Sequence, residues 1–304
     1  MCNAISACGL RKTYGDFVAV DDVDLEVKAG EVFAFLGPNG AGKTTTIDIL
    51  TGAQRRTSGD VSVLGCDPQQ DQRQWRSQVG VVPQGTAEYS ALTVAEVIEH
   101  FGSFYANPFP TQQLIDMVGL GAKAKVVAPK LSGGQRRRLD VAVGVVGRPR
   151  LLFLDEPTTG LDPEARREAW ELVRLLTSEG MTTVLTTHYL DEAQALAQRA
   201  GIIVRGRMLH VGTLEDLAKL SGRSHRVSYN RDPLIDVPNY LAERLSSPPH
   251  TCLYATDEPS TLLRLLLEAA NQQGIREIPG LEVIQPSLEQ IYISMIEHAK
   301  EGQP

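Results

Sequence analysis

Continuous apolar runs and segments of helical spacing follow one another along most of the chain. Val32–Leu36 and Leu151–Leu154 are uninterrupted apolar runs of strand length, which is typical of parallel strands buried on both faces of a sheet. Thr45–Leu50 and Pro163–Glu179 instead carry apolar residues at the spacing of a helix. Together these patterns predict an α/β core built on a parallel sheet.

Weaker patterns predict further elements on either side of these runs. Before and after the first apolar run, short strands are expected at Ile5–Leu10, Phe17–Val20, Val23–Val27 and Gly59–Leu64. After the second run, the expected elements are a strand at Met181–Thr187, a helix at Leu190–Arg199, and a hairpin of Gly201–Val204 with Met208–Val211.

A helical segment interrupts the core between the two apolar runs. Thr93–Ala106 has helical spacing, and Thr93 with Glu96 three residues later forms the pattern of a capping box. The prolines of Asn107–Pro110 end that helix, and Thr111–Val118 predicts a second one. The periodicity of this segment therefore predicts two helices between the two apolar runs.

The character of the sequence changes at Ser221–Ser224, which has the composition of a linker. Beyond it, strands are expected at Arg226–Tyr229, Thr251–Ala255 and Leu281–Ile284, and helices near Asn239–Leu245, at Pro259–Gln273 and at Leu288–Lys300. The chain is thus expected to hold a large domain at residues 4–220 and a small α/β accessory domain at residues 224–300. The small domain shows no constellation of catalytic residues.

Charge and composition exclude several classes of protein. The net charge of −7 argues against broad nucleic-acid binding, which depends on Lys and Arg side chains that neutralise phosphates. No apolar segment approaches the roughly 20 residues of a membrane-spanning helix, and the N-terminus lacks the regions of a signal peptide. The four cysteines, Cys2, Cys8, Cys66 and Cys252, are scattered without a CxxC pair. This spacing is typical of reduced cytosolic thiols.

The first apolar run leads into a phosphate-binding motif. Residues 37–44 match G-x-x-x-x-G-K-[ST] at every fixed position and lie between a predicted strand and a predicted helix, the context that a P-loop requires. Lys43 is expected to bridge the β- and γ-phosphates, and Thr44 to hold Mg²⁺. The predicted phosphate-binding residues are Gly37, Pro38, Asn39, Gly40, Ala41, Gly42, Lys43, Thr44 and Thr45.

The second apolar run ends in two acidic residues, Asp155 and Glu156. Ligands of parallel sheets bind beyond the carboxyl ends of the strands, so both carboxylates should lie beside the P-loop. Asp155 is then the acid that supports Mg²⁺, and Glu156 is placed to polarise the attacking water.

A third motif, Leu131–Gln135 (LSGGQ), lies between the P-loop and the acidic pair. In that position it resembles the signature of ATP-binding cassette (ABC) ATPases, and the resemblance covers roughly residues 4–215. It implies a P-loop NTPase cassette with an antiparallel β subdomain and a helical subdomain, at roughly residues 85–148, inserted into the α/β core. It also implies a head-to-tail homodimer with two MgATP between the subunits. Ser132, Gly133, Gly134 and Gln135 would then meet the nucleotide of the partner subunit.

The resemblance assigns four more residues, each on a short local match. Tyr14 matches the aromatic residue that stacks on adenine, and Gln84 matches the glutamine that senses Mg²⁺ and the γ-phosphate. Asp162 matches a loop acid that crosses the dimer interface, and His188 matches the switch histidine at the γ-phosphate. Ser132 is expected to cap the helix that follows, whereas Arg136–Arg138 are expected to form a solvated face of that helix.

The resemblance also implies a membrane partner. Cassette ATPases of this kind act on a separate integral membrane permease at the cytoplasmic face of the cell membrane, and Gly85–Leu92 is the candidate docking surface. Segments such as Gly37–Gly52, Leu131–Leu139, Thr158–Pro163 and the tail Pro286–Tyr292 resemble the daunorubicin and multidrug exporter branch. Two other hypotheses are an importer ATPase and a soluble cassette factor that acts on ribosomes or DNA. The single cassette and the acidic balance disfavour the second of these.

Overall fold

The computed structural model describes residues 3–70, 73–85, 89, 91–220, 225–230, 235 and 237–284. The chain divides into two compact units, Met1–Leu214 and Glu215–Pro304. The expected helix Leu288–Lys300, the tail Pro286–Tyr292, the expected linker Ser221–Ser224 and half of the candidate docking surface Gly85–Leu92 lie outside the described residues.

The first unit is built on a six-stranded sheet with the strand order β5-β6-β7-β3-β8-β9. The strands β5, β6, β7, β3 and β8 run parallel, and β9 pairs with β8 as the antiparallel arm of the predicted hairpin. The bounds are β3 Val32–Leu36, β5 Val79–Val82, β6 Leu151–Asp155, β7 Thr182–Thr187, β8 Arg199–Val204 and β9 Arg207–Thr213. Every residue of β3, β6 and β7 is buried, as the apolar runs at β3 and β6 predict.

A second, three-stranded antiparallel sheet has the order β2-β1-β4, with β1 at Asn3–Tyr14, β2 at Phe17–Lys28 and β4 at Ser58–Val63. The separate strands expected at Phe17–Val20 and Val23–Val27 are wrong, because β2 is one continuous strand. The alternation of apolar and polar residues is interrupted near Asp22, which adopts a φ of 55°. The pairing with β1 shifts register there, so β2 continues without ending. Side chains of both sheets share one core with helix α1, Lys43–Leu50.

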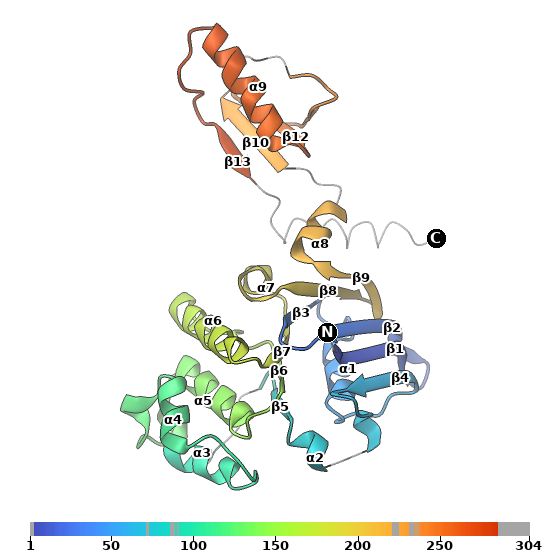
Figure 1. The fold of residues 1–304 in the computed structure, drawn as a ribbon, viewed down its shortest axis with the longest axis vertical. Helices are drawn as coiled ribbons and strands as arrows, with labels where there is room; N and C mark the ends of the chain where they lie inside the picture. Colours follow the sequence, from blue (N-terminus) through green and yellow to red (C-terminus); the bar gives the residue numbers. More distant parts are fainter. Residues whose placement is uncertain are drawn as a thin grey trace. The chain divides into compact units, whose positions relative to one another are not determined.

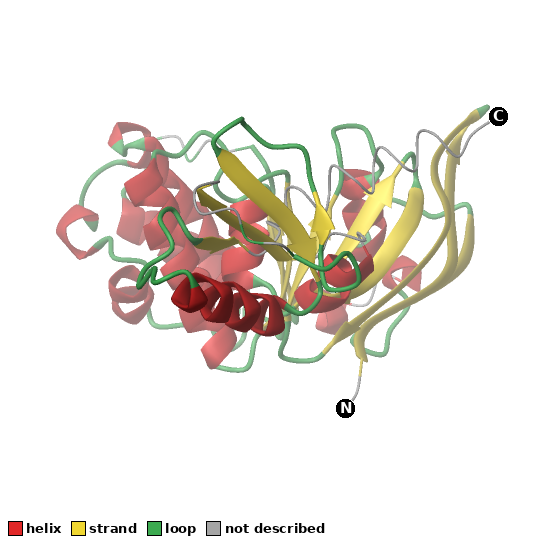
Figure 2. Cartoon of the chain, turned by 90° about the horizontal axis from the view of Figure 1, so that it is seen from above, coloured by secondary structure: helices red, strands yellow, loops and turns green. Residues whose placement is uncertain are grey.

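Helices α3, α4, α5 and α6 gather on one side of this unit, and strands β1, β2 and β4 lie on the opposite side together with α1 (Figures 1 and 2). Helix α3 has the predicted capping box at Thr93 and Glu96 but ends earlier than expected. Helix α7 also stops before its predicted end, because β8 begins at Arg199. The bounds are α2 Arg73–Arg76, α3 Val94–Gly102, α4 Thr111–Met117, α5 Gly133–Val145, α6 Pro163–Ser178 and α7 Leu190–Leu196, with short 3-10 turns at Pro68–Gln70, Gly121–Lys123 and Ala128–Lys130. Helix α8, Leu214–Leu220, begins at the last residue of the first unit and continues into the second.

The second unit contains a four-stranded antiparallel sheet with the order β11-β12-β10-β13. Its elements are β10 His225–Asn230, β11 Glu243–Arg244, β12 Thr251–Thr256, α9 Pro259–Gln272 and β13 Glu282–Ile284. The helix expected near Asn239–Leu245 is wrong: that segment forms a turn and then the edge strand β11. Thr256 fixes the turn, because its hydroxyl donates a hydrogen bond to the carbonyl oxygen of Leu241.

Candidate functional site

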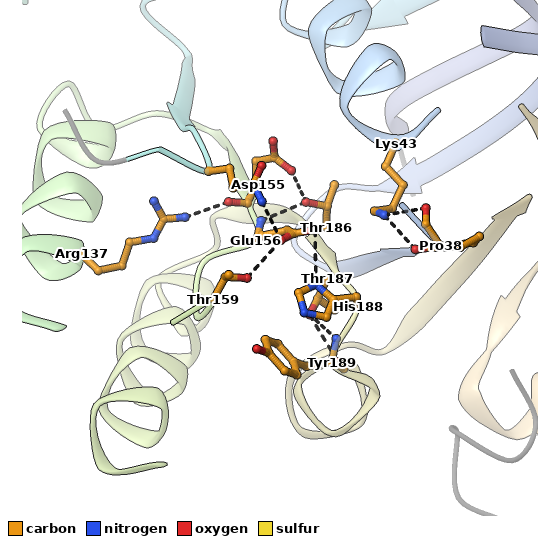
Figure 3. Close-up of polar contacts among 12 residues, drawn as sticks. Pro38, Lys43, Arg137, Asp155, Glu156, Thr159, Thr186, Thr187, His188 and Tyr189 are labelled. Carbon is orange, nitrogen blue, oxygen red and sulfur yellow. Dashed lines mark hydrogen bonds and ion pairs between the residues drawn. The ribbon is translucent and has the colours of Figure 1, made fainter. Parts of the chain in front are cut away.

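The carboxyl ends of four neighbouring parallel strands bring the predicted catalytic residues to one edge of the six-stranded sheet. The P-loop follows β3, Gln84 follows β5, Glu156 follows β6 and His188 follows β7. Strands that run parallel end at the same edge, so residues more than a hundred positions apart in sequence become neighbours. This arrangement produces the site in Figure 3.

Backbone geometry explains the glycines of the P-loop. A Cβ atom on Gly37 would lie 2.4 Å from the carbonyl oxygen of Ile203, and one on Gly42 would lie 2.5 Å from that of Ala19. Gly42 also has a φ of 102°, a conformation that other residues rarely adopt. The loop therefore packs directly on the β8–β9 hairpin and on β2, which fixes its backbone N–H groups in front of helix α1.

Lys43 is buried, and its ammonium group binds the backbone of the P-loop to which it belongs. Its Nζ atom donates hydrogen bonds to the carbonyl oxygens of Gly37 (2.8 Å) and Pro38 (3.1 Å), as Figure 3 shows. Burial lowers the pKa of the Lys43 ammonium, and the nearby carboxylates of Glu156 and Asp155 partly oppose that shift. The ammonium is thus held between the loop and the two acids.

Glu156 lies at the centre of the polar contacts. Its Oε2 atom accepts hydrogen bonds from Gln84 Nε2 (2.8 Å) and Thr159 Oγ1 (3.1 Å), and its Oε1 atom lies 3.3 Å from His188 Nδ1. The structure therefore brings Gln84, Glu156 and His188 into direct contact, although only 9% of the Glu156 side chain is exposed. A general base needs such a fixed orientation toward the proton that it removes.

The backbone of Glu156 adopts a conformation that is costly for an acidic residue. Its φ is 46°, and left-handed geometry costs a residue with a Cβ roughly 1–2 kcal/mol. Thr186 holds it there, because the Glu156 N–H donates to both the carbonyl oxygen (3.1 Å) and the hydroxyl (3.0 Å) of Thr186. The same hydroxyl donates to the Asp155 carboxylate. Strain of this kind is characteristic of functional positions.

The predicted Mg²⁺ ligands offer oxygen atoms only: the hydroxyl of Thr44, the carboxylate of Asp155 and the amide oxygen of Gln84. That set suits a hard cation such as Mg²⁺. No group of three or more His, Cys, Asp or Glu side chains that could hold a metal occurs in the described part of the chain. Three protein oxygen atoms would leave the other positions of an octahedral Mg²⁺ to phosphate oxygens and water, which is the usual way in which this ion is held.

Two separate hollows are lined by most of the predicted nucleotide-binding residues, whereas Tyr14, Gly37, Pro38 and Ala41 line neither. One, of about 430 Å³, is lined by P-loop residues together with Gln84, Glu156, Ala19 and Phe17. The other, of about 320 Å³, is lined by Ser132, Gly133, Gly134 and Gln135 together with Gly160–Asp162 and the start of α6. The two hollows share no lining residue. The signature and the P-loop of this chain thus belong to different sites.

Local hydrogen bonds shape the second hollow. Ser132 caps α5 as predicted and forms a capping box with Gln135. Asp162 caps α6, since its carboxylate accepts hydrogen bonds from the N–H groups of Glu164 (3.0 Å) and Ala165 (2.9 Å). The structure therefore gives Asp162 a local role, in addition to its predicted place at an interface.

Phe17 is a candidate that the sequence reasoning missed. Tyr14 is the predicted adenine-stacking residue, and its hydroxyl accepts a hydrogen bond from Gln54 Nε2 at 3.1 Å. Phe17, the residue directly opposite Tyr14 in the β1–β2 pairing, lines the P-loop hollow and is 63% exposed. The sequence held a signal for Phe17, which follows Tyr14 after the two-residue turn Gly15–Asp16. Residues directly opposite each other across such a turn share one face of the hairpin, so Phe17 should lie on the same face as Tyr14.

Comparisons with known proteins agree with this geometry. A family model described as "ABC transporter" matches residues 20–159. The chain is 39% identical over 267 residues to a Nod factor export ATP-binding protein I of Cupriavidus metallidurans, covering 84% of this chain and 88% of the relative. It is 35% identical over 308 residues to the daunorubicin/doxorubicin resistance ATP-binding protein DrrA of Streptomyces peucetius, covering 97% and 93%.

Solved structures show the same fold. The structure of an ATP-binding subunit of an ABC transporter superposes with a TM-score of 0.65 at 26% identity, covering 72% of this chain and 93% of that chain. A dimeric post-hydrolysis state of an ATP-binding cassette bound to ADP and Pi gives a TM-score of 0.62 at 24% identity, covering 69% and 98%.

Proposed function

Because the chain belongs to the ATP-binding proteins of ABC transporters and is an ATPase of that family, we propose that two copies close head to tail around two MgATP and drive the export of a compound through a separate membrane permease. One observation carries this proposal: the P-loop and the signature line two hollows that have no residue in common. A second copy supplies the missing half of each site.

Each residue at the sheet edge has a role in this proposal. Lys43 binds the β- and γ-phosphates, and the glycines of the P-loop let its backbone N–H groups approach them. Thr44, Asp155 and Gln84 would hold Mg²⁺, which neutralises the charge of the phosphates when it is bound. Glu156 accepts a proton from the attacking water, and His188 donates a hydrogen bond toward the γ-phosphate.

The partner subunit completes the site. Ser132, Gly134 and Gln135 bind the γ-phosphate held on the opposite P-loop, and Asp162 lies beside them. Contacts that exist only with the triphosphate favour the closed dimer, so hydrolysis favours opening. The helical segment of α3, α4 and α5 would transmit this movement to a permease.

The named relatives support export as the direction of transport. They carry out Nod factor export and confer daunorubicin and doxorubicin resistance. None of the described helices combines the length and the apolar character needed to cross a bilayer. A separate integral membrane subunit would therefore form the pathway, and this chain would bind it at the cytoplasmic face of the membrane. Drugs or other hydrophobic compounds are the proposed cargo.

Capture of the permease tests the proposal. A tagged Glu156→Gln variant, loaded with MgATP in mildly solubilised native membranes, is expected to co-purify with a polytopic membrane protein and without a substrate-binding protein. A Lys43→Ala variant purified in parallel controls for contacts that do not depend on nucleotide. Recovery of a secreted substrate-binding protein would favour an importer, and recovery of ribosomes or DNA without a membrane protein would contradict the transport proposal.

Phe17 is expected to contribute to nucleotide affinity. Base stacking on an aromatic ring is worth about 1–3 kcal/mol, so Phe17→Ala should raise the Kd for MgATP by about tenfold. Titration with a fluorescent ATP analogue measures the change, with Tyr14→Ala beside it. Phe104→Ala is the matched control, because Phe104 is equally exposed at 62% but lines neither hollow. An unchanged Kd for Phe17→Ala would leave stacking to Tyr14 alone.

A further inference from the structure

Arg137 lies two residues beyond the signature, in the middle of the run Arg136–Arg138. The expectation that this run forms a solvated face is wrong for Arg137, of which only 5% is exposed. Its neighbours differ from it: Arg136 donates to the carbonyl oxygen of Ala128, and Arg138 pairs with the half-exposed Glu168. A buried arginine is rare unless its charge and its donors are matched by partners.

The partners of Arg137 are three backbone carbonyl groups. Nε donates to Pro157 O (2.9 Å), Nη2 to Asp155 O (2.8 Å) and Nη1 to Pro83 O (2.6 Å). Figure 3 shows the side chain reaching from its helix to the end of β6. Asp155 and Pro157 are the residues on either side of Glu156, and Pro83 immediately precedes Gln84. One guanidinium group therefore binds the backbone on both sides of Glu156 and the backbone before Gln84.

These contacts act on a strained segment. Glu156 has a φ of 46°, and its N–H group is already engaged by Thr186. Thr186 binds the N–H group of Glu156, whereas Arg137 binds the carbonyl groups of the residues before and after Glu156. The side-chain amide of Gln84 donates a hydrogen bond to the carboxylate of Glu156. Loss of Arg137 would release both backbone segments that orient this pair.

Only a guanidinium group can make the three contacts at once. It presents five N–H donors in a planar fork, whereas an ammonium is a compact point charge. Burial lowers the pKa of Arg137, while the carboxylates of Asp140 and Asp155 stabilise its charge. An apolar side chain would fill this space without a desolvation cost, so the polar contacts rather than packing account for an arginine here.

The geometry points to Arg137 as a positioning residue that holds the backbone around Glu156 and Gln84 in the orientation needed for hydrolysis, and that ties this backbone to the signature helix of the same subunit. The inference rests on the proposed role of Glu156 as the base. Because Arg137 and Ser132 lie on the first turns of one helix, the element that meets the partner's nucleotide also holds the base of its own site. A displacement of 1 Å at a catalytic group can cost about 100-fold in rate.

Steady-state hydrolysis by the purified full chain tests this role. Arg137→Gln is expected to lower kcat by about 100-fold, and Arg137→Lys by about tenfold, with KM for MgATP changed less than about threefold. Arg136→Gln, which removes the same charge one residue earlier on the helix, should keep kcat within about twofold. Thermal melting of each variant shows whether it is folded under assay conditions.

A second measurement separates positioning of the base from damage to the signature helix. In a Glu156→Gln background the base is already lost, yet the ATP-bound dimer still needs an intact signature. Adding Arg137→Gln should therefore leave the MgATP-dependent dimer unchanged by light scattering. Loss of that dimer would show that Arg137 acts through the signature, and this outcome would overturn the inference.

The inference fails separately from the proposed function. If the wild-type chain hydrolyses ATP, Glu156→Gln does not, and Arg137→Gln keeps a kcat within about threefold of wild type, Glu156 remains the base and Arg137 has no positioning role. A fall in kcat with an equal rise in KM, or with unfolding at the assay temperature, would also overturn the inference. If the wild-type chain does not hydrolyse ATP, the proposed function itself fails.

Discussion

Replacing Glu156 with glutamine is expected to abolish ATP turnover and to trap the protein as an ATP-bound dimer. The amide keeps the shape of the side chain but cannot accept a proton from the attacking water. General base catalysis contributes about 10²- to 10⁴-fold, so kcat should fall by at least about 100-fold. Binding should persist, because Lys43, Thr44 and the glycines of the P-loop are unchanged.

Two measurements on the same sample check this outcome. Phosphate release reports turnover, and light scattering with and without MgATP reports the dimer. Glu171→Gln is the control, since Glu171 is an exposed acid on α6 away from both hollows. Normal steady-state ATPase in the Glu156 variant would remove this residue from its role as the base. A variant that is inactive but stays monomeric with MgATP would contradict the closed dimer instead.

Each predicted catalytic residue is set by a short local pattern, and the structure brings these residues to one edge of the six-stranded sheet. The P-loop and the acidic pair each follow an apolar run, and His188 follows the threonine-rich strand β7. Parallel strands carry such positions to one edge of a sheet. The contacts among Gln84, Glu156 and His188 follow from strand order, which places β5, β6 and β7 side by side. Their distances depend on backbone details, such as the positive φ of Glu156, that no motif encodes.

Arg137 was missed because three consecutive arginines suggest a solvated surface. A signal was nevertheless present, since Arg137, Val141 and Val145 recur every four residues along α5. All three are buried. Helical periodicity places them on one face, and it outweighs the average preference of arginine for solvent.

The secondary-structure errors have different causes. The short helix expected near Asn239–Leu245 fails because a few apolar residues cannot distinguish a helical turn from an edge strand. Pairing with β12, the next strand along the chain, decides the outcome there. The division of β2 into two strands failed because a bulge shifts the alternation without ending the strand.

Replacing Lys43 with alanine is expected to weaken nucleotide binding itself, in contrast to Glu156→Gln. The ammonium is the only cation that lines the P-loop hollow among the described residues. Its hydrogen bonds to Gly37 and Pro38 hold it beside the loop. Hydrogen bonds between charged groups contribute about 1.5–3 kcal/mol each, so two phosphate contacts would raise the Kd for MgATP by at least about 100-fold.

Isothermal titration with MgATP distinguishes this loss of affinity from a loss of catalysis. Lys125→Ala, which removes an exposed lysine outside both hollows, should keep the wild-type Kd. Thermal melting without nucleotide separates lost phosphate contacts from a loosened loop, because Lys43 also binds two loop carbonyl groups. Equal Kd values for Lys43→Ala and wild type would contradict the phosphate-binding role. The two variants together separate two steps of the proposed ATPase cycle. Lys43 is required for nucleotide binding and for closure of the dimer, whereas Glu156 is required only for the hydrolysis that reopens the dimer.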